Sequence, residues 1–176
     1  MPLWIIYHTP DCFVDTASKQ ALAKDITGIY TRIGLPAFYV IVNFVLTPSG
    51  TAFKGGEIPD KPFVRITMDH IAVHLESSVE EYRASTAAFE EVLKPHIADK
   101  GYDYEYHADE TERELWRVNG FIPPPWQSEA EKEWARLNKA VPYELDEGKR
   151  GQPLLSPIKL NEMRKAAEEA AAASKA

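Results

Sequence analysis

The chain opens with the stretch PLWIIY at residues 2–7, a proline followed by an unbroken run of apolar side chains. A short run that is apolar at every position is typical of a strand at the centre of a sheet, buried on both faces. If Met1 is removed, the nitrogen of Pro2 becomes a free secondary amine, which can act as a base or a nucleophile. A buried strand behind it would hold this amine in place. The sequence therefore makes Pro2 the first candidate for a catalytic residue.

A helical pattern follows this first strand. Apolar residues recur at helical spacing from Leu22 to Ile33, and Asp15 or Thr16 is suited to cap the start of the helix. The β-branched and aromatic run at residues 38–46 then predicts a second strand. A strand, a helix and a strand in this order predict a unit whose two strands are parallel and joined by a right-handed crossover.

The same plan repeats further along the chain. Residues 63–73 begin as a strand, Ser78 starts a capping box for a second helix, and residues 102–107 alternate tyrosine with polar side chains as a strand does. We therefore predict an α/β (α+β) fold in which two fused β-α-β units form a four-stranded mixed sheet with two helices on one face.

These units also set the expected domain boundaries. The sequence predicts one domain followed by a polar tail that is either helical or disordered. The domain is expected at residues 2–143, with the first unit at 2–50, the second at 62–108 and a capping segment at 109–143, and the tail at 144–176.

Composition excludes several classes of function. The chain has 176 residues and a net charge of −7, and its Lys and Arg residues form no cluster, so a nucleic-acid partner is not expected. No apolar run is long enough to span a bilayer, which argues against a membrane partner. The single cysteine, Cys12, suits a reducing compartment, and we expect a cytoplasmic protein.

Five short stretches, taken in order, resemble one known family. They are PLWIIY at 2–7, AKDIT at 23–27, VNF at 42–44, FKGG at 53–56 and FIP at 121–123. Over about residues 2–143 the chain resembles the tautomerase superfamily, and within it the fused group that includes cis-3-chloroacrylic acid dehalogenase. The resemblance implies a catalytic N-terminal proline, no cofactor and assembly as a homotrimer.

Other family positions have changed in this sequence. The resemblance places Tyr30 where the dehalogenase has a histidine at the end of the first helix, and it places Ile71 and His74 on or near two arginines that bind the substrate carboxylate. Tyr106 keeps the family's tyrosine on the fourth strand, whereas Arg117 lies on or near the glutamate that activates water. The loss of that glutamate argues against hydrolytic dehalogenation.

These matches and the residue chemistry give a set of candidate site residues. Tyr106 is expected to donate a hydrogen bond to an enolate oxygen, and Arg117 to orient the substrate unless it pairs with Glu112 or Glu114. His70 and His74 lack a third ligand, so no metal is expected. The predicted catalytic residues are Pro2, Tyr106 and Arg117, and the predicted substrate-binding residues are His74, His70 and Tyr30.

Arg65 lies on the predicted strand at residues 63–73, and no role in catalysis is expected for it. It is predicted to form an ion pair with Asp69 on the same strand face.

The predicted function is a cofactor-independent isomerase that uses Pro2 as a general base on a small, anionic carbonyl compound. Two alternatives stay open at this point. One is a non-catalytic protein that binds a ligand or a partner on the same fold, and the other is a hydratase or dehalogenase of unsaturated acids.

Overall fold

The computed structural model describes residues 2–72, 74 and 78–144. Four strands and three α-helices make up the described part of the chain, with three short 3₁₀ turns between them. In chain order the elements are β1 (Leu3–His8), α1 (Thr16–Thr31), η1 (Ala37–Tyr39), β2 (Ile41–Leu46), β3 (Phe63–His70), α2 (Val79–Leu93), η2 (Ala98–Lys100), β4 (Asp103–Glu110), η3 (Arg113–Leu115) and α3 (Glu129–Leu137).

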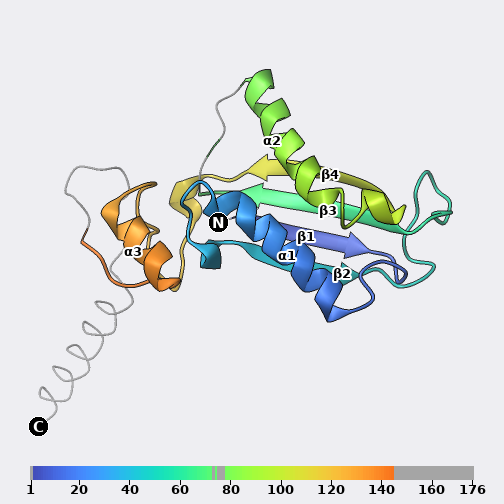
Figure 1. Cartoon of the computed structure of the whole chain (residues 1–176), viewed down its shortest axis with the longest axis horizontal. Coiled ribbons are helices and arrows are strands. Elements are labelled where there is room, and N and C mark those ends of the chain that lie inside the picture. Colours follow the sequence, from blue (N-terminus) through green and yellow to red (C-terminus); the bar gives the residue numbers. More distant parts are fainter. Residues whose placement is uncertain (1, 73, 75–77, 145–176) are drawn as a thin grey trace, which may run out of the picture.

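The strands form a single mixed sheet in the order β2-β1-β3-β4 (Figure 1). β1 pairs with β2 in parallel and β3 pairs with β4 in parallel, while the two central strands β1 and β3 are antiparallel. Each parallel pair is joined by one helix. The prediction of two fused β-α-β units in a four-stranded mixed sheet is therefore confirmed.

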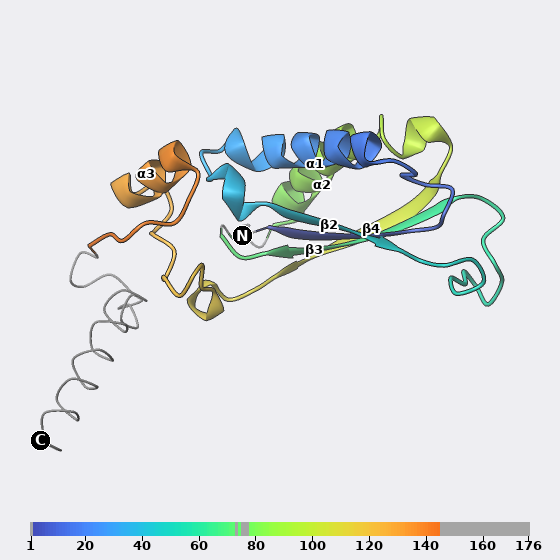
Figure 2. The same cartoon turned by 90° about the horizontal axis from the view of Figure 1, so that it is seen from below.

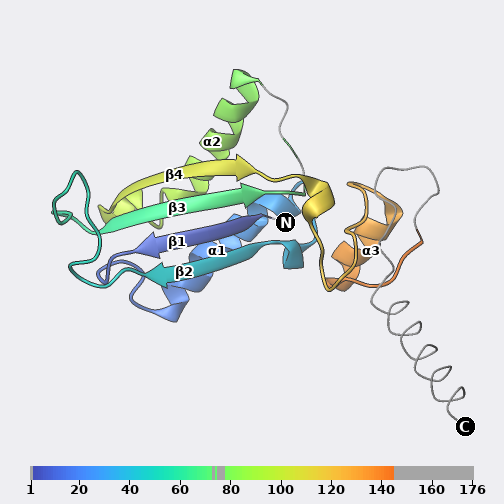
Figure 3. The ribbon, with the colours of Figure 1, turned by 180° about the vertical axis from the view of Figure 1, so that it is seen from behind.

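Both long helices cover the same face of the sheet, and no α-helix of the described residues covers the opposite face (Figures 2 and 3). The strand side chains alternate accordingly, so Trp4 and Ile6 are fully buried under the helices. On the open face Leu3 and Ile5 are only half-buried, and Tyr7 is 37% exposed. The prediction that β1 is buried on both faces is thus wrong for the single chain, because helices cover one face only.

Polar side chains at the predicted caps begin the two long helices. Asp15 accepts a hydrogen bond from the Ser18 amide at 2.7 Å, and Ser78 accepts one from the Glu81 amide at 3.1 Å. Each bond satisfies a backbone donor that the first helical turn leaves without a partner. The second strand starts later than predicted, at Ile41, because residues 37–39 after Pro36 form a 3₁₀ turn.

The segment after β4 packs beyond the end of the sheet at which β1 starts (Figures 1 and 2). Its centre is Trp134 of α3, which is fully buried and donates a hydrogen bond to the Val141 carbonyl at 2.8 Å. The expected tail at 144–176 lies outside the described residues, apart from residue 144. None of the helices among the described residues is long and apolar enough to cross a membrane.

Candidate active site

Pro2 lies where three elements of the fold meet. β1 starts, α1 ends and β3 ends at the same end of the sheet (Figure 1). Pro2 is buried there, and its carbonyl oxygen accepts a hydrogen bond from the Ile41 amide at 3.0 Å. This bond ties the start of β1 to β2, so the proline is held by the sheet.

A cavity of about 250 Å³ opens beside Pro2. Its wall comes from the end of α1, the end of β3 and the middle of α2. Besides Pro2, the lining residues are Ile29, Tyr30, Ile33, Leu35, His70, Ile71, Ala72, Ser85, Ala88 and Phe89. The structure therefore brings together three of the predicted site residues, namely Pro2, Tyr30 and His70.

A chain of buried hydrogen bonds connects β1, α1 and β3 behind this cavity. The Trp4 indole donates to the Tyr30 hydroxyl at 2.8 Å, and the Tyr30 hydroxyl lies 2.8 Å from Nε2 of His70. Within the described residues the Tyr30 hydroxyl has no other acceptor, so its proton goes to Nε2. This assigns His70 as a neutral imidazole that carries its own proton on Nδ1.

Burial favours the uncharged forms of both residues. It lowers the pKa of His70, against the opposing effect of Glu110 and Asp69. It also raises the pKa of the Tyr30 hydroxyl far above its usual value. At neutral pH the cavity is therefore lined by a neutral histidine and a protonated tyrosine.

Tyr106 lies in a neighbouring hollow. Its hydroxyl donates to the Thr86 carbonyl at 3.4 Å, and it lines a separate space of about 410 Å³ between α2 and β4. The ring of Phe89 lies 5.7 Å from the His70 ring and 6.3 Å from the Tyr106 ring, measured between centroids, and lines both spaces. His70 and Ser85 also line both spaces, whereas Tyr106 lines only the second and Pro2 only the first. Burial and hydrogen bonding to Glu90 raise its pKa to about 12.

Arg117 and His74 do not line the cavity either. Nη1 of Arg117 donates to the carbonyls of Glu114 and Trp116, both at 2.7 Å. The alternative prediction of an ion pair with Glu112 or Glu114 is wrong in the described structure, because the guanidinium bonds backbone oxygens instead. His74 is exposed, and its Nε2 lies 2.8 Å from the Thr111 carbonyl.

Comparison with known proteins assigns this arrangement to a family. The sequence model of the family described as "Putative oxalocrotonate tautomerase enzyme" matches residues 1–139. The chain belongs to the tautomerase superfamily. The solved structure of native RhCC from Rhodococcus jostii RHA1 is similar to this chain. The two are 42% identical over 80% of this chain and 99% of RhCC, with a TM-score of 0.75.

Other solved structures agree with this assignment to the tautomerase superfamily. A probable enzyme from the thermophilic fungus Aspergillus fumigatus is 40% identical over 81% of this chain and 98% of its own, with a TM-score of 0.75. N1, a member of the cis-3-chloroacrylic acid dehalogenase family, shares the fold at 16% identity, covering 75% of this chain and 89% of its own, with a TM-score of 0.55. No curated protein matches the chain. The predicted resemblance to the superfamily is confirmed, and the resemblance to its fused dehalogenase-like group holds at the level of the fold.

Sequence reasoning missed two residues of this tautomerase-superfamily site. Trp4 supplies the first donor of the hydrogen-bond chain, and Phe89 lines both hollows. The alternation of β1 gave a usable signal for Trp4, which shares the buried face with Ile6 and His8. Phe89 gives no such signal, because an apolar residue on a helix indicates packing and not a role in a site.

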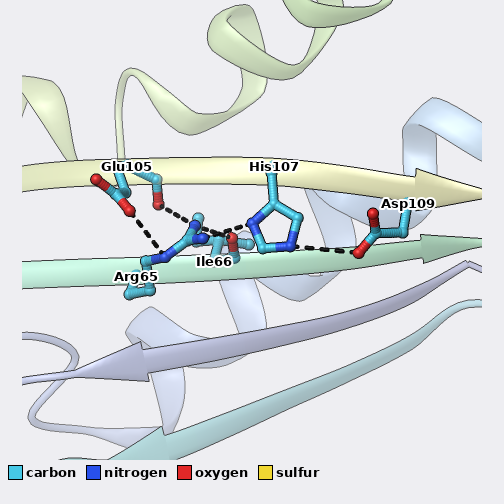
Figure 4. Close-up of polar contacts among 5 residues, drawn as sticks. All are labelled: Arg65, Ile66, Glu105, His107 and Asp109. Carbon is cyan, nitrogen blue, oxygen red and sulfur yellow. Dashed lines mark hydrogen bonds and ion pairs between the residues drawn. The ribbon is translucent and has the colours of Figure 1, made fainter.

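Arg65 pairs across strands and not along its own strand (Figure 4). Its Nε lies 3.0 Å from Glu105, and its Nη2 lies 2.5 Å from Nδ1 of His107, which in turn lies 3.3 Å from Asp109. The predicted ion pair with Asp69 is wrong, because four residues of strand separate the two side chains by roughly 13 Å. Glu105 is the direct neighbour of Arg65 in the register of β3 with β4.

None of the described residues forms a group of three metal-ligating side chains.

Proposed function

We propose that the chain is a cofactor-independent tautomerase in which the Pro2 nitrogen is the general base. The observation that supports this most strongly is the position of Pro2, buried at the wall of a cavity that also contains His70 and Tyr30. An ordinary α-amino group titrates near pH 8, and burial favours its neutral form. A neutral amine held in a largely apolar cavity is suited to remove a proton from carbon next to a carbonyl.

The reaction would use two groups of this chain. The C–H bond next to the carbonyl breaks, its proton moves to the Pro2 nitrogen, and the electron pair forms an enolate. In this proposal Nδ1–H of His70, a residue that lines the cavity, donates a hydrogen bond to the enolate oxygen. The proton then moves from Pro2 to the enolate oxygen, which gives the enol. In ketonisation the proton moves in the opposite direction, from the enol oxygen to Pro2 and then to carbon. The sequence predicted that Tyr106 would donate the hydrogen bond to the enolate oxygen, and in this proposal His70 donates it. The roles predicted for Tyr106, Arg117 and His74 are not tested by the structure and stay predictions.

Ketonisation of phenylenolpyruvate, measured as the decrease in enol absorbance, tests this proposal. The variant Tyr30→Phe tests the hydrogen-bond chain. We expect the variant to lower kcat by about tenfold with little change in KM, because it removes the group that fixes the His70 tautomer. The acid limb of the pH profile should move to higher pH. Without the Tyr30 hydroxyl as donor, Nε2 of His70 is free to take up a proton, and the protonated form gains stability.

A packing role for Tyr30 alone predicts a different result. The pH profile would then keep its acid limb while the melting temperature falls. Thr27→Val on the same helix is the matched control, because the Thr27 hydroxyl bonds only the Ala23 carbonyl within α1.

We also propose that the protein assembles as a homotrimer through the open face of the sheet. One half of this face is apolar and already half-buried, with Leu3 and Ile5 on β1 and the partly exposed Ile41 and Val45 on β2. The outer strands β2 and β4 are also unpaired on their far sides within the described chain. Copies packed around a symmetry axis would cover both the apolar strip and the strand edges.

Val45→Lys is expected to weaken this assembly, because an unpaired ammonium would be buried in the interface. The protein concentration at which half of the trimer dissociates should rise by about 10²-fold or more. Sedimentation velocity over a concentration series measures the change. Val14→Lys is the control, since Val14 is 77% exposed in the loop before α1. A trimer that persists unchanged in Val45→Lys would place the interface elsewhere.

A further inference from the structure

No cationic side chain of the described residues lines the cavity beside Pro2. Seven of its lining residues are apolar, and the remaining side chains are Pro2, Tyr30, His70 and Ser85. No Lys or Arg is among the described residues that line it. His70 is neutral, since the Tyr30 hydroxyl donates to its Nε2 and burial lowers its pKa.

The described arginines at this end of the fold donate to backbone carbonyls. Nε of Arg32, which follows α1, donates to the Gly28 carbonyl at 3.1 Å. Arg113 donates to the carbonyls of Ala72 and Pro124, and its guanidinium lies over the Trp116 ring at 5.5 Å. Nη1 of Arg117 donates to two carbonyls of its own segment. Moving the guanidinium of Arg113 or Arg117 into the cavity would break several hydrogen bonds that hold the segment after β4.

A carboxylate in such a cavity would lose its water without gaining a cation. Burying an ionised group without a partner is strongly unfavourable, whereas an uncharged hydrocarbon gains free energy from the same transfer. Ser85 and Nδ1–H of His70 can satisfy one carbonyl oxygen, but they cannot balance a full negative charge.

Building on the proposed function, we propose that this cavity takes an uncharged, largely apolar carbonyl compound, such as an aryl or alkyl ketone, aldehyde or ester. The carbonyl group lies at Pro2 and His70, and the hydrocarbon part packs against Ile29, Ile33 and Phe89. The sequence alone predicted an anionic substrate, held by Arg117 with His74 or His70. Of these three residues only His70 lines the described cavity, and its imidazole is neutral.

The test compares phenylpyruvate with its methyl ester, two substrates with the same reacting carbon and different charge. Exchange of the benzylic hydrogens with deuterated water is followed by NMR, with Pro2→Ala as the reference. We expect kcat/KM for the ester to exceed that for the acid by about tenfold or more. A preference for the acid that still depends on Pro2 would overturn the inference and leave the proposed function standing.

A charge placed in the cavity should reverse this preference. Ile71→Arg introduces a cation at the wall and is expected to shift the ratio of kcat/KM for the two substrates by about tenfold or more toward the acid. Ile71→Met adds length without charge and should affect both substrates alike. An unchanged ratio in a folded Ile71→Arg protein would contradict the inference.

Binding tests the inference even if the wild-type protein shows no exchange, a result that would reject the proposed function. Calorimetric titration with 1-phenylpropan-2-one and with phenylacetate compares two ligands that differ chiefly in charge. Tighter binding of the ketone is expected, and it should be lost in Ile71→Arg. Tighter binding of phenylacetate, or no binding of the ketone, would overturn the inference.

Discussion

Replacing Pro2 by alanine is expected to lower kcat for ketonisation by about 10²-fold or more. Alanine keeps an amine at the N-terminus, but it loses the pyrrolidine ring that fixes the direction of the nitrogen lone pair. The Ile41 amide would still hold the backbone oxygen of residue 2, so the strand should stay in place. The loss should therefore appear in kcat, with a melting temperature close to that of the wild type.

Two controls make the Pro2→Ala result decisive. Intact mass must show that Met1 has been removed from both proteins, because a retained methionine would block the nitrogen and exclude it as a base. Pro10→Ala changes an exposed proline in the turn after β1 and should keep full activity. Equal rates for Pro2→Ala and the wild type would remove Pro2 from the chemistry. A binding protein on the same fold would then be the better interpretation.

Local signals in the sequence were enough to predict this fold. The capping residues Asp15 and Ser78 marked the helix starts, and the spacing of apolar residues separated helices from strands. Two β-α-β units can be joined into one sheet in few ways, because each crossover is right-handed. What local patterns could not give is the exposure of the second face of β1, since that depends on what covers the sheet.

The candidate site was predictable only where regular structure positions it. Pro2, Tyr30 and His70 lie at the ends of a strand, a helix and a strand, and topology alone brings these ends together. Arg117 lies in the irregular segment after η3, whose path depends on backbone hydrogen bonds that leave no pattern in the sequence. Tyr106 lies on the predicted strand, but its position in a neighbouring hollow depends on side-chain packing against α2, which leaves no pattern in the sequence.

Trp134→Ala is expected to cost about 3–5 kcal/mol in the free energy of unfolding, the usual range for removing a large buried ring. Trp134 has no exposed surface, and its ring packs against four other aromatic rings. Its indole also donates to the Val141 carbonyl, which would lose its partner. These rings join α3 to the segment before β2. The substitution should therefore weaken the packing of the segment after β4, called the cap below, against the sheet.

Urea unfolding of Trp134→Ala and the wild type at the same protein concentration measures this cost, since assembly makes stability depend on concentration. Trp126→Ala is the matched control, because Trp126 is 46% exposed, and it should change stability by no more than about 0.5 kcal/mol. A cost for Trp134→Ala no larger than that of Trp126→Ala would show that the cap does not unfold with the sheet. An early separate transition in Trp134→Ala would show instead that the cap unfolds first. In that case Leu35, which lines the cavity just before the segment that α3 holds, should become mobile, and KM should rise before the sheet unfolds.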